Sequence, residues 1–525
     1  MRVESCDVRF WTAAAFTLAV AHVPPVENAR ILAVETFPGK SHWNFVSAVL
    51  RALTDGGHHV TVFTPFPEGD RANYTEVDTS DRFAKVIAMD LTALKRLFSN
   101  PLTIVAQTMK MFRADCDSIY GDRRLTDLLA DDPAARFDAI LIEPGPPACL
   151  TYAAVGTGLP VVHAVPNPKK YYADRWTDGE VSNPAAVTTM MARQAVPKTF
   201  VQRFTNTLLS LYIELAGVVF DSAMFAVGTA PHHAHAPVPP SVVFNNGHYI
   251  SDAPRPVSPN TVNVGGIHLK PVGSLPKDIL EFIEDSPHGV ILFTFGSTVL
   301  MSSLPNHMKT VIIEALAQLP QRVLLKYEDE MENKPDNVMI RKWLPQRDIL
   351  AHPKVKLFVS HGGISGVYEA VDAGVPVLGF PLFADQHRNI DNLVEAGMAI
   401  SMELFSVTTG TLFKNLVELV NNEKYAKNAK IASDIFKDRP MSPQQSVVYW
   451  VEYVIRHKGA PHLKSQAFNL TWYEYFLLDV IAAVSISIAT VSYAIFRLFK
   501  IVFQYSFKRP RTAKIKPEYL FSLRS

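Results

Sequence analysis

This sequence has few cysteines, almost no net charge and no glycine-rich nucleotide-binding motif. Three cysteines in 525 residues exclude a disulfide-rich scaffold, and a formal net charge of +1 gives no overall attraction to nucleic acid. Neither G-x-G-x-x-G nor a P-loop occurs, which argues against a dinucleotide oxidoreductase and a P-loop NTPase. Apolar sequence is plentiful, because 48% of the residues are hydrophobic and only 19% are charged. A chain of this length is expected to form two or three domains.

The N-terminal segment has the composition of a secretory signal peptide. Arg2 and Arg9 precede an apolar run that ends at Val23, and Ala19-Val-Ala21 provides the small residues of a cleavage site. A buried first helix is the alternative, but the run is short and two prolines follow it. We therefore predict that residues 1–21 are a signal peptide.

A second apolar segment, residues 476–499, predicts a transmembrane helix. About 20 helical residues cross the apolar part of a bilayer, and this segment lacks the polar face that a core helix would show. The tail at residues 500–525 is basic, and basic flanks remain in the cytosol. The two apolar segments together predict one membrane span, a lumenal body and a short cytosolic tail.

The few cysteines and two glycosylation sequons fit a lumenal body. Cys6 would leave with the signal peptide, which leaves Cys116 and Cys149 either bridged or as free thiols. Asn73 and Asn469 each begin an Asn-x-Thr sequon. Both are predicted glycosylation sites in this topology.

Short apolar strands alternate with helices in the first half of the chain. The expected strands are Arg30–Glu35, His59–Thr64, Phe137–Ile142 and Pro160–Ala164. Helical spacing of apolar residues predicts a helix at Trp43–Thr54, between the first two strands. Strand, helix and strand at this spacing form a parallel unit with a right-handed crossover.

The same alternation returns after residues 231–273, a stretch rich in proline, asparagine and glycine in which we place a domain boundary near Asn263. The expected elements that follow are strands at Val290–Phe295, Arg322–Lys326, Val355–Ser360 and Val375–Phe380, and helices at Pro305–Gln318, Gly363–Ala373 and Gln386–Ala396. The sequence thus predicts an α/β protein with two facing, doubly wound Rossmann-like domains, at residues 22–263 and 264–445. Residues 446–475 are expected to form a return helix and a membrane-proximal segment. Ligands of such folds bind at the carboxyl ends of the strands.

The most informative pattern runs from Trp343 to Gln386. It reads WLPQRDILAHPKVKLFVSHGGISGVYEAVDAGVPVLGFPLFADQ, and it resembles the signature of the UDP-glycosyltransferase family. The matching positions are Trp343, Gln346, His361, Gly362, Gly363, Glu369, Pro376, Asp385 and Gln386. The resemblance, which is greatest to insect UDP-glucosyltransferases, extends more loosely over the whole chain. It implies a fold of the GT-B type and a UDP-sugar as co-substrate.

The centre of this pattern suits a diphosphate. A strand ends at His361, and the pair Gly362-Gly363 opens a helix whose unpaired amides can bind an anion. His361 can add a hydrogen bond to a phosphate oxygen, although a histidine that only caps the turn is the alternative. Ser297, after a strand, resembles the family's phosphate-side serine, and Ser365 stands where many members have asparagine.

The flanks of the pattern suit the nucleoside and the sugar. Trp343 offers an indole face to uracil, and Gln346 can bind the edge of the base. Glu369 could accept both ribose hydroxyls, and Asp385 and Gln386 could bind sugar hydroxyls. The alternatives are core packing for Trp343, a solvated surface position for Glu369 and a helix cap for Asp385. Arg255 resembles a donor-side arginine only weakly, and a surface arginine is its alternative.

His42 is the predicted catalytic base. It lies in Gly39-Lys-Ser-His-Trp43, after the first strand and just before a helix, and its alternative is a packing or capping histidine. An imidazole suits removal of an acceptor proton at neutral pH. The family commonly places Asp after the strand that here ends at Ile142, and the residue at that position is Glu143. We expect Glu143 to orient His42, with Asp138 as runner-up.

These features predict an inverting enzyme that moves a hexose, with glucose favoured, from a UDP-sugar to a hydroxyl of a small lipophilic acceptor. The alternatives are UDP-glucuronic acid as donor, a lipid- or sterol-directed transferase, and a non-catalytic lipophile-binding protein. Apolar residues in Leu91–Phe112 could line a pocket or meet the membrane, although core packing is the favoured interpretation. The sequence leaves the acceptor and the oligomeric state open, including a homo-oligomer.

No pattern is interpreted as a metal site, and no cofactor or nucleic acid partner is expected. Charge on the departing UDP is expected to be met by helix amides and by His361. Residence in the endoplasmic reticulum membrane follows from the family resemblance.

Overall fold

The computed structural model describes residues 26, 28–83, 90–91, 100–145, 148–167, 179, 182–189, 192–331 and 333–507. It contains two compact units, a body up to Ser465 and a C-terminal unit from Gln466. The predicted signal peptide, residues 1–21, and the basic end of the tail lie outside the described residues.

The first domain of the body is built on a seven-stranded parallel sheet. Its strands lie in the order β3-β2-β1-β4-β5-β6-β7. Their bounds are β1 Arg30–Val34, β2 His59–Thr64, β3 Tyr74–Asp78, β4 Ala139–Ile142, β5 Val161–Val165, β6 Val242–Asn245 and β7 Thr261–Asn263. Strand order reverses between β1 and β4, and ligands of doubly wound sheets bind at this point.

The second domain repeats this architecture with six parallel strands, in the order β10-β9-β8-β11-β12-β13. Their bounds are β8 Val290–Thr294, β9 Arg322–Lys326, β10 Val338–Arg341, β11 Val355–Ser360, β12 Val377–Gly379 and β13 Ala399–Ser401. The reversal lies between β8 and β11, which puts His361 at the carboxyl edge of its centre. The predicted pair of doubly wound sheets is therefore present.

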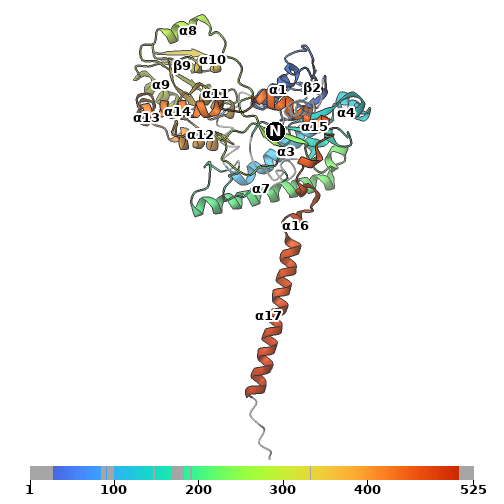
Figure 1. Ribbon diagram of the computed structural model, residues 1–525. Helices are drawn as coiled ribbons and strands as arrows, with labels where there is room; N and C mark the ends of the chain where they lie inside the picture. The colour runs from blue at the N-terminus through green and yellow to red at the C-terminus, as the bar shows by residue number, and fades with distance from the viewer. Residues whose placement is uncertain are drawn as a thin grey trace, which may run out of the picture. The chain divides into compact units, whose positions relative to one another are not determined.

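Helices connect the strands of both sheets. In the first domain they are α1 Lys40–Asp55, α3 Pro101–Tyr120, α4 Arg123–Ala130, α5 Pro133–Arg136 and α7 Phe200–Val227, with 3-10 turns η1 Ala148–Ala154 and η2 Pro231–Ala234. In the second domain they are α8 Lys277–Glu284, α9 Asn306–Ala317, α10 Gln346–Leu350, α11 Ile364–Ala373, α12 Gln386–Glu395, α13 Thr409–Asn421 and α14 Glu423–Lys437, with η3 Met301–Ser303 and η4 Leu404–Ser406. The two sets of elements gather on opposite sides of the body, with α8 and α9 on one side and α4 and β2 on the other (Figure 1).

After α14 the chain returns to the first domain. Helix α15 (Pro443–Arg456) inserts Val447, Val451 and Val454 into the core that contains Trp43. The 3-10 turn η5 (Pro461–Leu463) follows within the body, and η6 (Gln466–Asn469) opens the C-terminal unit. Helix α15, which follows the second domain along the chain, is therefore part of the core of the first domain.

The element boundaries differ from the sequence prediction where local hydrogen bonds intervene. Helix α1 begins at Lys40 rather than Trp43, because Gly39 is its N-cap and its carbonyl accepts from the amides of His42 and Trp43. Strand β4 begins at Ala139 rather than Phe137, because the Phe137 amide still bonds to Pro133 of α5. Both shifts are local consequences of capping.

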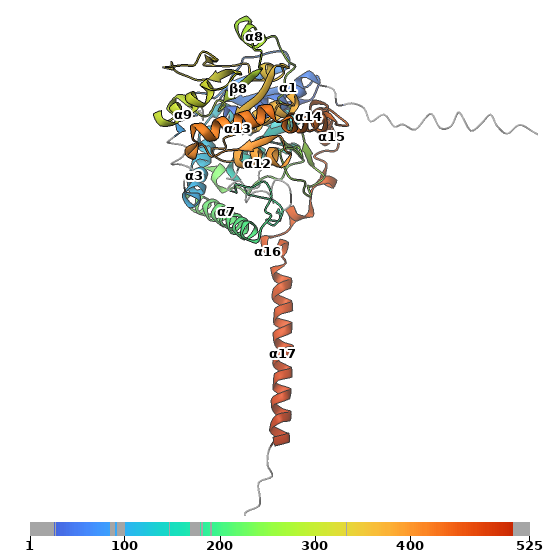
Figure 2. The same cartoon turned by 90° about the vertical axis from the view of Figure 1, so that its left-hand side faces the viewer.

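Helix α7 packs one face on α3 and leaves another face bare. Ile213 contacts Ile104 and Met109 of α3, and the two helices lie side by side in both views (Figures 1 and 2). Along the other face, large apolar side chains are more than half exposed, namely Phe200, Val201, Phe204, Leu208, Leu211, Leu215, Val218 and Val219. Their spacing of three and four residues makes one continuous stripe, which is unusual for a surface that faces only water.

The C-terminal unit holds α16 (Trp472–Tyr475) and the long helix α17 (Leu478–Phe507). Within the described residues, α17 is the helix that is long and apolar enough to cross a membrane, with a mean hydropathy of 1.9 in its most apolar window. It begins slightly after the predicted start at residue 476 and continues past residue 499, because Ile501, Val502 and Phe503 extend the apolar helix. The protein is a single-pass membrane protein.

The two cysteines that the sequence left as either bridged or free form a disulfide bond. Cys116 of α3 and Cys149 of η1 are bonded, with 6.0 Å between their Cα atoms. Both are buried in the core that surrounds β4. The bond fastens the end of α3 to the segment that follows Glu143.

Candidate active site

A cavity of about 410 Å³ lies between the two domains of the body. The first domain lines it with Phe37, Gly39, Ser41, His42, Asn44, Ile104, Gln107, Thr108, Met111, Phe112, Pro166 and Asn167. The second domain lines it mostly from the stretch that the sequence singled out, residues 343–386. The predicted donor residues and the predicted base therefore share one space.

His42 and Glu143 form a close pair at the first-domain wall. His42 Nδ1 lies 2.5 Å from Glu143 Oε1, and the His42 side chain keeps 20% of its surface exposed. Because a carboxylate accepts, Nδ1 carries the proton, and the unprotonated Nε2 is left as a base. His42 lies inside the first turn of α1 rather than before it.

Glu35 is a third member of this group, which sequence reasoning missed. Strands β1 and β4 pair in register, with Val34 beside Ile142, so Glu35 and Glu143 emerge side by side. Both are buried, with exposed fractions of 1% and 5%. Burial raises the pKa of Glu35 well above its usual range, and the charge of Glu143 and a hydrogen bond to it raise the pKa further, against a smaller lowering by His42. Both effects favour the protonated form of Glu35, which can donate a hydrogen bond to Glu143.

The runner-up for the orienting role, Asp138, lies at the other end of the strand. Its Oδ2 accepts from the Arg30 amide at 2.7 Å, at the amino ends of β1 and β4. It is therefore excluded from contact with His42. Sequence position alone had left this choice open, and the parallel register decides it.

In the second domain, His361 stands between two glycines. A Cβ on Gly296 would lie 2.7 Å from the His361 ring, and a Cβ on Gly363 would lie 2.6 Å from it. Burial lowers the pKa of His361 to about 4, with Asp385 opposing and Lys326 adding to this effect. His361 is therefore neutral near pH 7 and can donate one N–H to an anion.

The first turn of α11 supplies further donors beside His361. Gly363 is the N-cap, and Ile364, Ser365 and Gly366 line the cavity with amides that have no acceptor inside the helix. Ser297, after β8, lines the same region. Gly362 itself does not line the cavity, because it shapes the turn with a φ of +83° and its carbonyl accepts from Asn389.

Trp343, Gln346 and Glu369 lie at the other end of the second-domain wall. Trp343 is 71% exposed and lines the cavity, so the interpretation as a core residue is wrong. Gln346 Nε2 donates to Glu369 Oε2. Burial raises the pKa of Glu369 to about 7, although the Gln346 hydrogen bond and Arg347 lower it. Glu369 is therefore no solvated surface residue but a half-buried carboxyl that lines the cavity.

The loop before α12 presents Asp385 and Gln386. Asp385 occupies the N-cap position but its side chain makes no capping bond, and Oδ2 accepts from Asn389 Nδ2 at 2.8 Å instead. Gln386 Oε1 accepts from the amides of Leu382 and Phe383, at 2.9 and 3.2 Å. Only the side-chain amide nitrogen of Gln386 remains available to a ligand. Gln386 can therefore donate a hydrogen bond to a sugar hydroxyl but cannot accept one with its side chain.

Arg255 does not reach this site. It pairs with Asp252, and only 7% of its side chain is exposed. It is absent from the lining of the cavity. The interpretation of Arg255 as a surface arginine is wrong, because its side chain is buried against its own turn, and the structure gives its weak match to a donor-side arginine no support.

The cavity also contains residues that the sequence did not single out. Lys326, at the end of β9, lines the cavity, and its Nζ donates to Glu328 at 2.8 Å. On α3, Met111 and Phe112 line the first-domain wall, so core packing is too simple an interpretation for that helix. A basic residue at the carboxyl end of a buried strand is the signal that could have found Lys326.

Comparison with known proteins identifies the family. The model of the UDP-glucoronosyl and UDP-glucosyl transferase family matches residues 31–512. The chain belongs to this family. UDP-glucosyltransferase 2 of Dactylopius coccus is 35% identical over 501 residues, which cover 93% of this chain and 96% of the relative. UDP-glucuronosyltransferase 2B13 of Oryctolagus cuniculus is 31% identical over 495 residues, covering 89% of this chain and 92% of the relative.

Solved structures agree on the fold. The glycosyltransferase SnogD from Streptomyces nogalater superimposes with a TM-score of 0.52 at 17% identity, over 81% of this chain and 99% of that chain. Spinosyn forosaminyltransferase SpnP gives a TM-score of 0.50 at 17% identity, over 81% and 99%. The GT-B fold and the UDP-glycosyltransferase activity predicted from the sequence are thus confirmed.

Proposed function

We propose that this UDP-glycosyltransferase transfers glucose from UDP-glucose to a hydroxyl of a small lipophilic acceptor, with inversion at the anomeric carbon. The observation that carries the proposal is the His42–Glu143 pair, 2.5 Å apart, on the wall of a cavity whose opposite wall holds the donor residues. The glucose assignment rests on the insect relative, whose name is UDP-glucosyltransferase.

In this mechanism His42 Nε2 takes the proton of the acceptor hydroxyl. The acceptor oxygen forms a bond to the anomeric carbon as the bond from that carbon to the β-phosphate oxygen breaks, and its electron pair leaves with UDP. Glu143 stabilises the imidazolium that forms on His42. Glu35 keeps its own proton beside the ionised Glu143, so the two carboxyl groups together carry one negative charge rather than two.

The second domain grips the donor along its length. Trp343 stacks on uracil, Gln346 binds the base edge and Glu369 accepts the ribose hydroxyls. His361, Ser297, Ser365 and the first amides of α11 bind the diphosphate and stabilise the charge on departing UDP. Asp385 accepts from the sugar hydroxyls, and the Gln386 amide donates to them. We expect these groups to stabilise that charge with no metal ion.

The acceptor side of the cavity is apolar. Phe37, Ile104, Met111 and Phe112 line it, and Phe37 packs on His42 with 4.4 Å between ring centroids. A lipophilic acceptor fits this wall. Lipophilic compounds concentrate in a bilayer, and α17 would anchor the enzyme to one. The exposed apolar stripe of α7 supports the same location, because a lipid surface is one environment in which that stripe is stable.

We place the body in the lumen of the endoplasmic reticulum, after removal of residues 1–21. The basic tail supports a cytosolic C-terminus, and the Cys116–Cys149 bond supports an oxidising compartment. Asn73 and Asn469 are exposed, as acceptors of glycosylation must be.

The proposal is tested with His42→Ala and a matched control, His307→Ala, which changes an exposed histidine on α9. Full-length enzyme in lipid nanodiscs is incubated with UDP-glucose and a panel of phenols and aliphatic alcohols. We expect His42→Ala to lose transfer by about 10³-fold or more while its affinity for UDP-glucose stays within about threefold of wild type. Wild-type turnover in His42→Ala would refute the assignment of the base. A parallel assay with UDP-glucuronic acid separates the two donors.

A further inference from the structure

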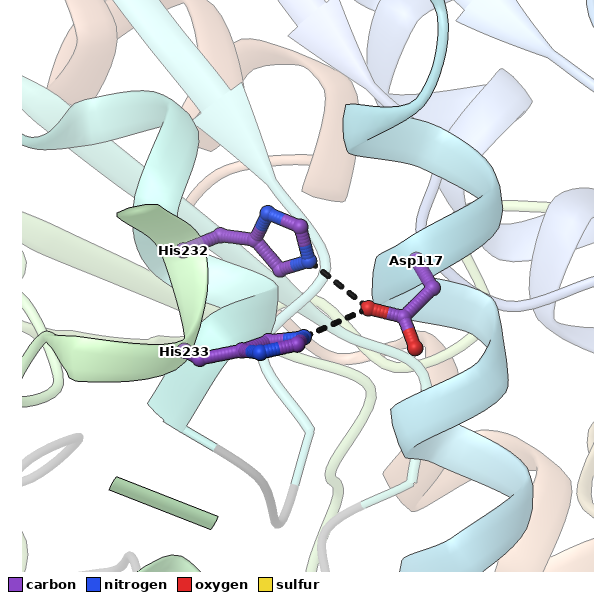
Figure 3. Close-up of side chains that lie close together, drawn as sticks. All are labelled: Asp117, His232 and His233. Atoms are coloured by element: carbon purple, nitrogen blue, oxygen red, sulfur yellow. Dashed lines mark hydrogen bonds and ion pairs between the residues drawn. The ribbon is translucent and has the colours of Figure 1, made fainter. Parts of the chain in front are cut away.

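Two histidines on one turn point at a single carboxylate oxygen outside the active-site cavity. His232 Nε2 and His233 Nε2 lie 2.8 and 2.7 Å from Oδ1 of Asp117 (Figure 3). The histidines belong to η2, just after α7, and Asp117 belongs to the last turn of α3. None of the three lines the cavity. The established transfer reaction therefore does not explain this cluster.

We propose that Asp117, His232 and His233 bind a divalent transition-metal ion, zinc, with a water molecule as fourth ligand. Their three candidate ligand atoms all lie within 4.8 Å of one another, the one such group found among the described residues. Two imidazole nitrogens and a carboxylate oxygen form a ligand set that zinc accepts in open, four-coordinate sites.

The geometry needs little adjustment to accept the ion. Ligand atoms of a tetrahedral zinc site lie about 2.1 Å from the metal and thus about 3.4 Å from one another. The present contacts to Asp117 must therefore lengthen by roughly 0.6–0.7 Å. The Asp117 side chain is 52% exposed and can make this shift. The two histidines are only 9% and 12% exposed, and their ligand nitrogens, which lie within 4.8 Å of one another, must settle about 3.4 Å apart. Exposure of Asp117 also opens the site to water and to the entering ion.

The surroundings hold the histidines in position. The His232 ring packs against Tyr120 and Tyr152, with centroids 5.2 and 6.0 Å away, and the two histidine rings meet edge to face. Arg113, one turn earlier on α3, acts electrostatically on Asp117 and is the charge with which the ion must compete. The two imidazoles, which are already held close together, offset the repulsion between the Arg113 guanidinium and the metal ion.

Sequence reasoning overlooked this site. An acidic triplet, Asp115-Cys-Asp117, does occur, but it lies in helix α3, where its two carboxylates cannot face one ligand. Asp115 is buried, and burial raises its pKa to about 7. The partners of Asp117 come instead from η2, more than a hundred residues later.

A bound ion would fasten the acceptor wall. Asp117 follows Cys116, which is bonded to Cys149, and Met111 and Phe112 of the cavity wall lie on the same helix. The ion would join the end of α3 to the turn after α7, which already packs on α3. We therefore assign it a structural role rather than a part in the transfer reaction.

The test uses full-length protein in nanodiscs, without a polyhistidine tag, after removal of metal with a chelator. Cobalt(II) is titrated and followed by its visible absorption, and zinc is titrated in competition. We expect one equivalent with the absorption of a four-coordinate site, and no competition from magnesium or calcium, which prefer oxygen ligands.

Three variants locate the ion. Asp117→Asn keeps a hydrogen-bond acceptor for both histidines but removes the charged ligand, and His233→Ala removes one imidazole. His235→Ala is the matched control, because His235 packs on Tyr152 at 5.0 Å and lies outside the cluster. Dissociation constants should rise at least tenfold in the first two variants and stay unchanged in the control. Zinc should also raise the unfolding temperature of wild type but not of Asp117→Asn.

Two results would overturn the proposal. One is the absence of a stoichiometric cobalt signal in wild type, which would leave a hydrogen-bonded cluster only. The other is a signal of equal strength in Asp117→Asn, His233→Ala and wild type, which would place the ion elsewhere. Neither result bears on the transfer mechanism, which His42→Ala tests separately.

Discussion

The substitutions Glu143→Gln and Glu35→Gln, at two side chains that lie next to each other, should have very different effects on kcat. Glu143 and Glu35 emerge side by side from paired strands, but the account makes Glu143 ionised and Glu35 protonated. Glu143→Gln therefore removes a working charge, whereas Glu35→Gln replaces one neutral hydrogen-bond donor by another. The two variants are isosteric with wild type and serve as controls for each other.

The expected magnitude follows from the 2.5 Å contact between His42 Nδ1 and Glu143 Oε1. At this separation and an effective dielectric of about 20, opposite unit charges attract by roughly 6–7 kcal/mol, and a neutral amide retains part of that attraction. A loss of about 4 kcal/mol in the transition state corresponds to a fall of about 10³-fold in kcat. For Glu35→Gln we expect kcat within about threefold of wild type, because its hydrogen bond to Glu143 persists.

The assay is initial-rate kinetics with UDP-glucose at saturating acceptor, from neutral to alkaline pH. The charged and titratable groups that act on Glu35 are Glu143 and His42. Because burial and Glu143 raise the pKa of Glu35, its ionisation lies at higher pH than that of an ordinary carboxyl, and Glu35→Gln should remove that ionisation from the pH profile of kcat. Equal losses in the two variants would refute the protonated state of Glu35. An unimpaired Glu143→Gln would remove Glu143 from the mechanism.

Three further predictions concern residues on the donor side. Because the pKa of Glu369 is about 7 and its ionised form accepts the ribose hydroxyls, calorimetric affinity for UDP-glucose should rise about tenfold from pH 6 to pH 8. Glu369→Gln should bind weakly with no such dependence, and a wild-type affinity that is flat over this range would contradict the assignment. Burial of Glu369 also makes the donor-free enzyme less stable as pH rises from its unfolded pKa towards 7, so Glu369→Gln should raise the unfolding temperature at pH 8. Gly296→Ala places a Cβ 2.7 Å from the His361 ring at a φ of +71°, and should weaken donor binding by tenfold or more. Gly410→Ala, with open space around it, is its control, and equal donor affinities in the two variants would count against the fit around His361.

Local sequence patterns were sufficient for the centre of the second domain, although they did not predict the edge strands β10 and β13. Strands β9 and β11 have the predicted bounds, and Trp343, His361 and Glu369 reach the cavity as the spacing of the donor box indicated. Such a pattern is informative because neighbouring residues on one strand, turn and helix determine the geometry. The helix at Lys40 was misplaced by only a few residues, since a glycine N-cap has no side chain to announce it.

Contacts between distant segments escaped the sequence. Glu35 acts through Glu143, and Asp117 through His232, in each case across more than a hundred residues. Only the parallel register of β1 and β4 and the packing of η2 on α3 bring these groups together. Helix α7 was missed for a related reason, because its two apolar faces hide the amphipathic pattern that predicts a surface helix.

The most direct test of the whole account is a structure of Glu143→Gln with UDP-glucose and an acceptor bound. We predict uracil on Trp343, the ribose on Glu369, and the acceptor hydroxyl between His42 Nε2 and the anomeric carbon, about 3–3.5 Å from that carbon. A sugar nucleotide bound outside the cavity, or an anomeric carbon turned away from His42, would contradict it.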